Sequence, residues 1–205
     1  MSLARLIRER NEQRSEDGTQ GGKGTNTGTA FIGAAMSFSL SRIRADLDSL
    51  KGISSKVTAS PSDPFVVGVI VQPVRGIWEG GTFHFVLKFS DDYPYEGPKV
   101  RYTGPNRIFH PNIEGEADKE DWGVCLGLQL EWRPSYSIRD LVIGIELLFS
   151  YPVCDDPLPG VAKAAALMLK NHPCEFRKVA RCWMRGEYCQ NEGDLLQNAN
   201  ADEEY

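Results

Sequence analysis

Residues 108–138 have the sequence IFHPNIEGEADKEDWGVCLGLQLEWRPSYSI. It has little helical or strand periodicity, yet it contains Cys125 and the tripeptide His-Pro-Asn (110–112). Long irregular segments inside a compact domain carry function more often than not. Each signal is weak alone, because a lone cysteine is usually a buried apolar side chain and His-Pro-Asn also suits an ordinary turn. The segment therefore has to be interpreted together with the elements on either side of it.

A helix is predicted before this segment. Apolar residues recur there at helical spacing, at Met36, Leu40, Ile43, Leu47 and Leu50. Gly52 is a suitable stop for this helix. Arg42 and Arg44 lie off the apolar stripe, so we expect both side chains to reach solvent.

Strands follow this helix, and further helices come after the 108–138 segment. Three β-rich runs lie at 65–71, 82–89 and 99–103, and their short connections favour an antiparallel meander. Helical spacing returns from residue 138 onward, and two more helices fit 161–170 and 175–184. This order of helix, meander and helices indicates the α+β class.

The two ends of the chain differ from its middle in composition. Residues 11–29 contain no apolar side chain and five glycines, which predicts a flexible linker. Before it, Leu3, Leu6 and Ile7 form an apolar edge among arginines, so this start is either a docking peptide or disordered. The last 19 residues hold six acidic side chains and no Lys or Arg. We therefore expect a flexible N-terminal arm with a docking peptide (1–33), a core domain (34–186) and an acidic flexible tail (187–205).

Cysteine usage and hydropathy limit the class of protein. The 205 residues include five cysteines, an odd number, with no Cys-x-x-Cys, which argues against a disulfide framework and a zinc ribbon. The N-terminus lacks the apolar core of a secretory signal, and no run approaches 18 apolar residues. We expect a reducing compartment, cytoplasmic and nuclear, with no membrane and no nucleic-acid partner.

Two kinds of catalytic site are disfavoured by the residues alone. A cysteine hydrolase needs a base beside its nucleophile, and the candidates His84, His110 and His172 come with no recognisable protease signature. No two potential ligands show metal-binding spacing, so we expect no metal site.

Taken together, these elements resemble the ubiquitin-conjugating enzymes across residues 36–186. The matching pieces are KFSDDYPYEGPKV (88–100), FHPNI (109–113), GVCL (123–126), EWRPSYSI (131–138) and DDPL (155–158). The resemblance implies an N-terminal helix, a four-stranded antiparallel meander sheet and C-terminal helices. Within the family, the chain is most similar to the conjugating enzyme of the cullin modifier, in the neddylation pathway. That enzyme also has a docking peptide and linker before its core, and a helix end like WMRGEYC (183–189).

The resemblance implies an enzyme that carries its modifier as a thioester and needs no cofactor. Cys125 would accept the modifier's C-terminal glycine from an activating enzyme and pass it to a substrate lysine. Asn112 is implied as the oxyanion donor, with a turn-organising role as the alternative. His110 is implied to be structural. Asp155 and Asp156 match an acidic gate for the lysine, or an N-cap pair for the next helix.

Partner surfaces are also implied by position. Tyr95 and Pro134 match the family's ligase-binding loops, while Arg42 and Arg44 lie where activating enzymes dock. Trp132 is expected to brace the core. The expected partners are a ubiquitin-like modifier, its activating enzyme, a RING-type ligase and a cullin substrate.

The sequence departs from the family in three places. Asn112 and Cys125 are 13 residues apart, further than is usual, and the surplus lies in the acidic 114–121 insertion. It is either an inert bulge or a charged loop that steers a basic partner. Gly97 replaces a proline and is expected to loosen its loop, and Cys154 replaces a proline before the two acids. Two alternative functions remain open: a ubiquitin-conjugating enzyme proper, and an inactive variant acting as a binding module.

Overall fold

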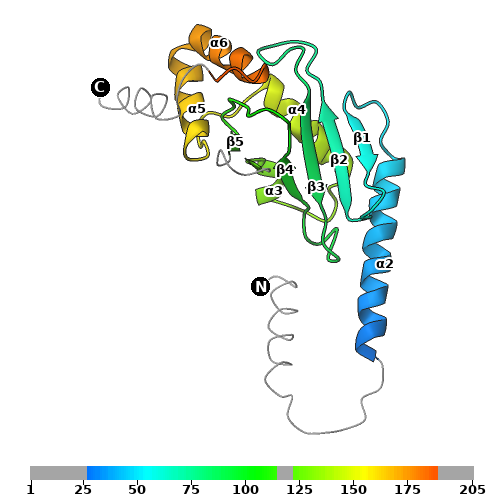
Figure 1. Ribbon diagram of the computed structural model, residues 1–205. Helices are drawn as coiled ribbons and strands as arrows, with labels where there is room; N and C mark the ends of the chain where they lie inside the picture. The colour runs from blue at the N-terminus through cyan, green and yellow to red at the C-terminus, as the bar shows by residue number, and fades with distance from the viewer. Residues whose placement is uncertain (1–26, 115–121, 189–205) are drawn as a thin grey trace.

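The structure is a computed structural model that describes the backbone of residues 27–114 and 122–188, and side chains from Met36 onward (Figure 1). The predicted docking residues Leu3, Leu6 and Ile7 lie outside the described residues. So do residues 115–121 of the acidic insertion and residues 189–205 of the tail. The elements, in chain order, are α2 (Thr27–Asp48), β1 (Lys56–Ala59), β2 (Val66–Val71), β3 (Phe83–Lys88), β4 (Lys99–Tyr102), β5 (Ile113–Glu114), β6 (Trp122–Val124), α3 (Gly127–Leu130), α4 (Ile138–Ser150), α5 (Val161–Asn171) and α6 (Pro173–Met184).

The strands form one antiparallel sheet in the order β1-β2-β3-β4-β6-β5. The three predicted runs are present as β2, β3 and β4, and β1 completes the antiparallel meander of four strands expected from the resemblance. The expectation of four strands is nevertheless too low, because β6 and β5 extend the sheet. These two strands have three and two residues, too few to show a period of two in the sequence. Their pairing places Ile113 opposite Val124, directly before Cys125.

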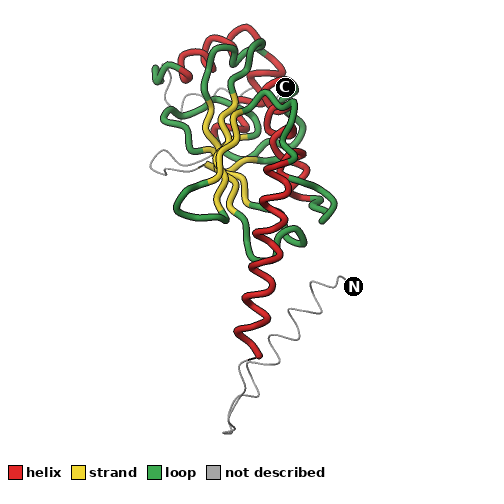
Figure 2. The backbone as a smooth tube through the Cα atoms, turned by 90° about the vertical axis from the view of Figure 1, so that its right-hand side faces the viewer, coloured by secondary structure: helices red, strands yellow, loops and turns green. Residues whose placement is uncertain are grey.

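One face of the sheet packs against helices, as the edge-on view in Figure 2 shows. Alternate residues of β2 and β3, such as Val67, Val69 and Phe85, point into this core and are buried. The buried face of α4 covers them with Ile138, Leu141, Val142, Ile145, Leu148 and Phe149. Full burial of such a side chain contributes about 1.5–3 kcal/mol, so each of these residues stabilises the packing of α4 on the sheet.

Helix α2 differs from its prediction at both its start and its buried face. It begins at Thr27, inside the predicted linker and arm, so the 33/34 boundary falls within the helix. The apolar stripe indicated only the part of the helix that packs on the core, whereas helix propagation continues beyond it. The fully buried positions are Ser39, Ile43 and Asp46, while Met36 is 40 % exposed. The buried face is rotated because the polar side chains at 39 and 46 bond to other segments.

Helices α5 and α6 pack against each other at one end of the molecule, beside β5 (Figure 1). Their aromatic contacts join Phe109 to Phe176 and Trp183, each with ring centroids 5.3 Å apart. The three predicted late helices are confirmed, and Pro173 occupies the first turn of α6, where its missing N–H costs nothing. Among the described residues, no helix is both long and apolar enough to cross a membrane.

Candidate active site

Cys125 lies at the end of β6, directly before Leu126 and the short helix α3. Its side chain is half-buried and it is a free thiol. Its backbone N–H donates to the Asn112 carbonyl oxygen over 2.8 Å. The structure therefore brings Cys125 and the His-Pro-Asn tripeptide together, despite the 13 residues between Asn112 and Cys125.

His110 is fully buried beneath this segment. Its Nδ1 accepts from the Asn112 backbone N–H at 3.0 Å, so its Nε2 carries the proton and donates to the Leu148 carbonyl oxygen at 3.2 Å. Burial lowers the pKa of His110 to about 3, against a smaller opposing effect of the Leu148 hydrogen bond. A neutral imidazole with both nitrogens engaged is a brace for the turn and not a base for Cys125.

The Asn112 side chain is buried and bonded to the loop that follows α4. Its Nδ2 donates to the Val153 carbonyl oxygen and its Oδ1 accepts from the Val153 N–H, each over 2.9 Å. An amide nitrogen carries two hydrogens, and among the described residues the second has no hydrogen-bond partner. The Asn112 side chain therefore joins the His-Pro-Asn turn to the loop that follows α4.

Asp155 and Asp156 lie in the loop of residues 153–160, and both are exposed. Asp155 forms an ion pair with Lys170 of α5 at 2.9 Å, and this hydrogen bond raises the pKa of Lys170. The alternative N-cap role is wrong, because the N-cap of α5 is Gly160 and receives no side-chain bond.

Glu114 supplies what the start of α5 lacks, and sequence analysis did not identify it. Its carboxylate accepts from the Ala162 backbone N–H. A carboxylate is favourable at this position, because the first N–H groups of a helix have no partner within the helix. The signal available in the sequence was indirect: Pro-Gly-Val-Ala (159–162) starts a helix with no Ser, Thr, Asp or Asn in the N-cap position.

Cys154 is a half-buried residue of the 153–160 loop. Burial raises the pKa of its thiol, with Lys170 lowering it and Asp155 raising it by smaller amounts. A raised pKa keeps the thiol protonated, and a protonated thiol is a poor nucleophile.

Trp132 connects its own loop to the loop that contains Pro94 and Gly97. Trp132 is half-buried and its Nε1 donates to the Pro94 carbonyl oxygen at 2.7 Å. Gly97 lies against the same ring, where a Cβ would approach to 2.7 Å. The glycine thus permits close packing of its loop, contrary to the loosening expected from the sequence.

The Arg42 side chain was expected to reach solvent, but it is half-buried and bonds to other parts of the same chain. Its guanidinium pairs with Asp46 at 2.9 Å and donates to the carbonyl oxygens of Pro134 and Tyr136 at 3.2 and 2.9 Å. Asp46 also accepts from the Tyr93 hydroxyl, and burial followed by this bond raises the pKa of Tyr93. Arg44, by contrast, is exposed on the same helix.

Tyr95 and Pro134 are both exposed. Tyr95 is 68 % exposed and stacks on Phe38 of α2, itself 53 % exposed, with ring centroids 6.4 Å apart. The Arg42 bond to Pro134 ties the second loop to the same helix. The predicted partner-binding residues 42, 95 and 134 are thus assembled around α2, separately from the contacts of Cys125.

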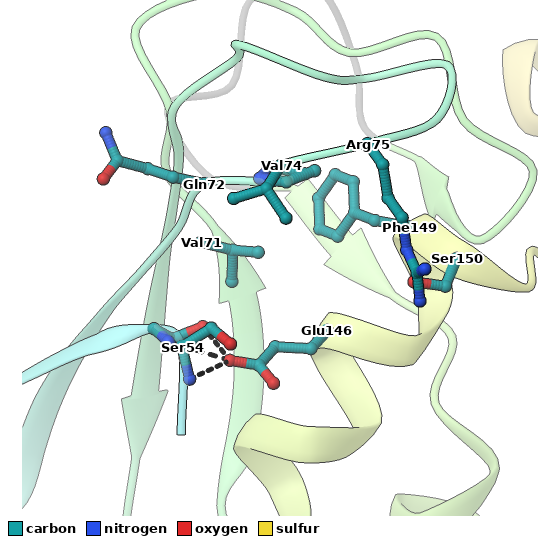
Figure 3. A pocket seen from close by; sticks show the side chains of 10 residues that line it. Ser54, Val71, Gln72, Val74, Arg75, Glu146, Phe149 and Ser150 are labelled. Atoms are coloured by element: carbon teal, nitrogen blue, oxygen red, sulfur yellow. Dashed lines mark hydrogen bonds between the residues drawn. The ribbon is translucent and has the colours of Figure 1, made fainter. Parts of the chain in front are cut away.

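One cavity of about 180 Å³ lies between the β2–β3 connection and the end of α4 (Figure 3). Glu146 closes one wall, where its Oε1 accepts from the Ser54 N–H, the Ser55 N–H and the Ser55 hydroxyl at 3.1, 2.8 and 2.7 Å. Neither Cys125 nor Asn112 lines this cavity. Within the described ranges, no three His, Cys, Asp or Glu side chains are grouped as metal ligands.

Comparison with known proteins identifies the family of this chain. The family model of the ubiquitin-conjugating enzymes matches residues 42–184. The NEDD8-conjugating enzyme ubc12 of Schizosaccharomyces pombe is 34 % identical over 149 residues, covering 71 % of this chain and 78 % of that relative. Ubiquitin-conjugating enzyme E2 N of Macaca fascicularis is 34 % identical over 135 residues, covering 65 % and 82 %.

The fold is similar to that of a solved structure. S. cerevisiae Ubc12 superposes with a TM-score of 0.60 at 27 % identity, covering 88 % of this chain and 90 % of that one. The matched range contains the His-Pro-Asn turn, Cys125 and the 153–160 loop, all of which the structure links by hydrogen bonds. This chain belongs to the ubiquitin-conjugating enzyme family.

Proposed function

We propose that this protein is a NEDD8-conjugating enzyme that carries the modifier on Cys125. The observation that supports this most directly is the free, half-buried thiol of Cys125 bonded through its backbone to Asn112. NEDD8 is the modifier named for relatives from Schizosaccharomyces pombe and other organisms, at about a third identity over most of the chain.

Loading is a thioester exchange. The Cys125 thiolate attacks the carbonyl carbon of the modifier's C-terminal glycine, which the activating enzyme holds as a thioester. The new C–S bond forms, the activating enzyme's sulfur leaves as a thiolate, and no net oxidation or reduction occurs. Such an exchange is close to isoenergetic, so the acyl group keeps its reactivity for the next step.

Transfer to lysine uses the same sulfur as the leaving group. A neutral lysine amine attacks the thioester carbonyl, its N–C bond forms, the C–S bond breaks and the amine loses a proton. The second Asn112 N–H is suited to the oxyanion that develops on the carbonyl oxygen. Asp155 and Asp156 lie on an exposed loop anchored to Asn112 through Val153, where carboxylates can orient the incoming ammonium group or accept its proton.

The ligase and the substrate belong to the same proposal. A RING-type ligase would contact the exposed Tyr95 and Pro134 next to α2, and a cullin would supply the lysine. A reducing compartment, cytosol or nucleus, suits an enzyme whose working group is a free thiol.

A modifier comparison tests this function. The full-length chain is incubated with ATP and either NEDD8 with its activating enzyme or ubiquitin with its activating enzyme. We expect a rapid reductant-sensitive adduct with NEDD8 and a much slower one with ubiquitin. A faster adduct with ubiquitin would favour the second candidate, a ubiquitin-conjugating enzyme, which the similarity to E2 N supports. No adduct with either modifier would favour an inactive binding module.

A further inference from the structure

The 153–160 loop is attached at both ends to one short segment, residues 112–114. At its first residue, the Val153 backbone pairs with the Asn112 side chain through two bonds of 2.9 Å. At its last residue, Gly160 adjoins the Glu114 carboxylate closely enough that an added Cβ would lie 3.3 Å from Oε1. Asn112 is the last residue of the turn before β5, and Glu114 is the last residue of β5, so only Ile113 separates the two side chains that hold the loop.

The Glu114 bond fixes the start of α5 as well. Its carboxylate accepts from the N–H of Ala162, the second residue of a helix that has no side-chain cap of its own. β5, which ends at Glu114, also contacts α5 (Figure 1). The end of the loop therefore depends on this side chain for its position relative to β5.

The same segment is paired with the strand that carries the nucleophile. Ile113 is opposite Val124 and Glu114 is opposite Gly123 in the β5–β6 ladder. The Cys125 N–H completes the contact by donating to the Asn112 carbonyl oxygen at 2.8 Å. Hence the chain of contacts from Cys125 to the 153–160 loop passes through Asn112 at one end of the loop and Glu114 at the other.

From this arrangement, and resting on the proposed function, we propose that Glu114 is a positioning residue for lysine transfer. By bonding Ala162 it holds the loop of Asp155 and Asp156 in register with Cys125, and it takes no part in loading. Acyl transfer to an amine requires the attacking nitrogen to be held in a narrow geometry, and small displacements of the groups that position it slow the reaction strongly. The proposal therefore expects discharge to lysine, and not thioester exchange with the activating enzyme, to depend on this loop.

Three substitutions separate the parts of this role. Glu114→Gln keeps an acceptor oxygen at the same reach and is expected to retain transfer within about twofold. Glu114→Asp is shorter by one methylene and is expected to lose the bond to Ala162. Glu114→Ala removes the acceptor altogether.

The matched control is Glu146→Ala. Glu146 also accepts backbone N–H bonds from a distant segment, at Ser54 and Ser55. It lines the cavity drawn in Figure 3, and neither Cys125 nor Asn112 is among the residues that line this cavity. It therefore reports the effect of losing a bridging glutamate on stability alone.

The experiment uses the full-length protein loaded with NEDD8, purified from the activating enzyme and then mixed with free lysine over a range of concentrations. For Glu114→Ala and Glu114→Asp we expect the maximum discharge rate to fall on the order of tenfold, with loading within twofold of the unaltered protein. Glu146→Ala should lower the melting temperature and leave the discharge rate unchanged.

Two results would overturn the positioning role. One is unchanged discharge in both Glu114→Ala and Glu114→Asp, and the other is an equal loss of discharge in Glu146→Ala. Failure of the unaltered protein to load with NEDD8 would instead refute the proposed function, so the two failures are distinguishable. If Glu114→Ala does not fold, the comparison of Glu114→Asp with Glu114→Gln decides.

Discussion

The Asn112 amide and the Val153 backbone form a closed pair, in which each residue both donates and accepts at 2.9 Å. This pair joins the turn that precedes β5 to the loop that carries Asp155 and Asp156. The amide organises the loop with one N–H, and the oxyanion role proposed for Asn112 would use the second N–H of the same nitrogen.

We expect Asn112→Ala to lose both roles. Leaving the Val153 N–H and carbonyl without their partner should cost about 1–3 kcal/mol of unfolding free energy, measured by urea denaturation. Loss of the oxyanion donor should slow lysine discharge by about 10²-fold or more, measured on the loaded protein. A variant with the stability loss and unchanged discharge would show that Asn112 is structural only.

Stability should depend on pH through His110. Its pKa is lowered by burial to about 3 from an ordinary value of 6.5, so the unfolded chain binds a proton that the folded chain excludes. The stabilisation is complete above pH 6.5 and is lost as the pH falls toward 3, with a loss on the order of 2 kcal/mol by pH 5. The measurement is the urea midpoint at pH 7, 6 and 5.

The control for this effect is His110→Gln, which cannot titrate. We expect its stability to be lower at pH 7 and flatter between pH 7 and 5. An equally steep pH dependence in His110→Gln would assign the effect to other groups.

Arg42 and Arg44 provide a matched pair on α2. Arg42→Ala removes the ion-pair partner of Asp46, whose side chain is only 9 % exposed, and it removes two bonds to carbonyl oxygens. We therefore expect the free energy of unfolding to fall by about 1–3 kcal/mol. Arg44→Ala removes an exposed charge and should change stability by less than about 0.5 kcal/mol. Equal effects of the two substitutions in urea denaturation would contradict the bracing role of Arg42.

Tyr188 should stabilise the end of the core through Arg107. The Tyr188 hydroxyl accepts from the backbone N–H of Arg107 at 3.0 Å. The Arg107 guanidinium lies 5.5 Å from the ring centroid of Tyr188 and 4.8 Å from that of Trp183. We expect Tyr188→Ala to cost about 1–2 kcal/mol, from one hydrogen bond and one cation–π contact. Tyr151→Ala, at a 72 % exposed tyrosine, is the control and should be near neutral in thermal unfolding.

The sequence alone predicted the elements whose residues repeat with a clear period. The alternation of 82–89 and the apolar spacing from residue 138 located β3 and α4. The cysteine and His-Pro-Asn motifs indicated a candidate site, and the structure brings these two motifs into contact. β1 was missed because three of its four residues are exposed and it is held by backbone pairing to β2. Such pairing leaves little trace in the order of apolar residues.

Contacts between distant residues could not be predicted in the same way. Asp46 is nearly buried in α2 because it pairs with Arg42, bonds to Tyr93 and accepts from the Ile138 N–H at 3.3 Å. Glu114 is 48 residues from Ala162 and was taken as part of an acidic insertion. In both cases, hydrogen bonding that appears only after folding overrides the local preference of a charged side chain for water.

The most direct test of the account is the mass and reductant sensitivity of the adduct with NEDD8. The protein is loaded with NEDD8, ATP and the activating enzyme, digested without reductant and mapped by mass spectrometry. We expect one thioester, at Cys125, which disappears on reduction and in Cys125→Ala, persists in Cys154→Ser, and becomes a reductant-resistant ester in Cys125→Ser. An adduct that forms on Cys125→Ala, or no adduct at all on the unaltered protein, would contradict the assignment of Cys125 as the carrier.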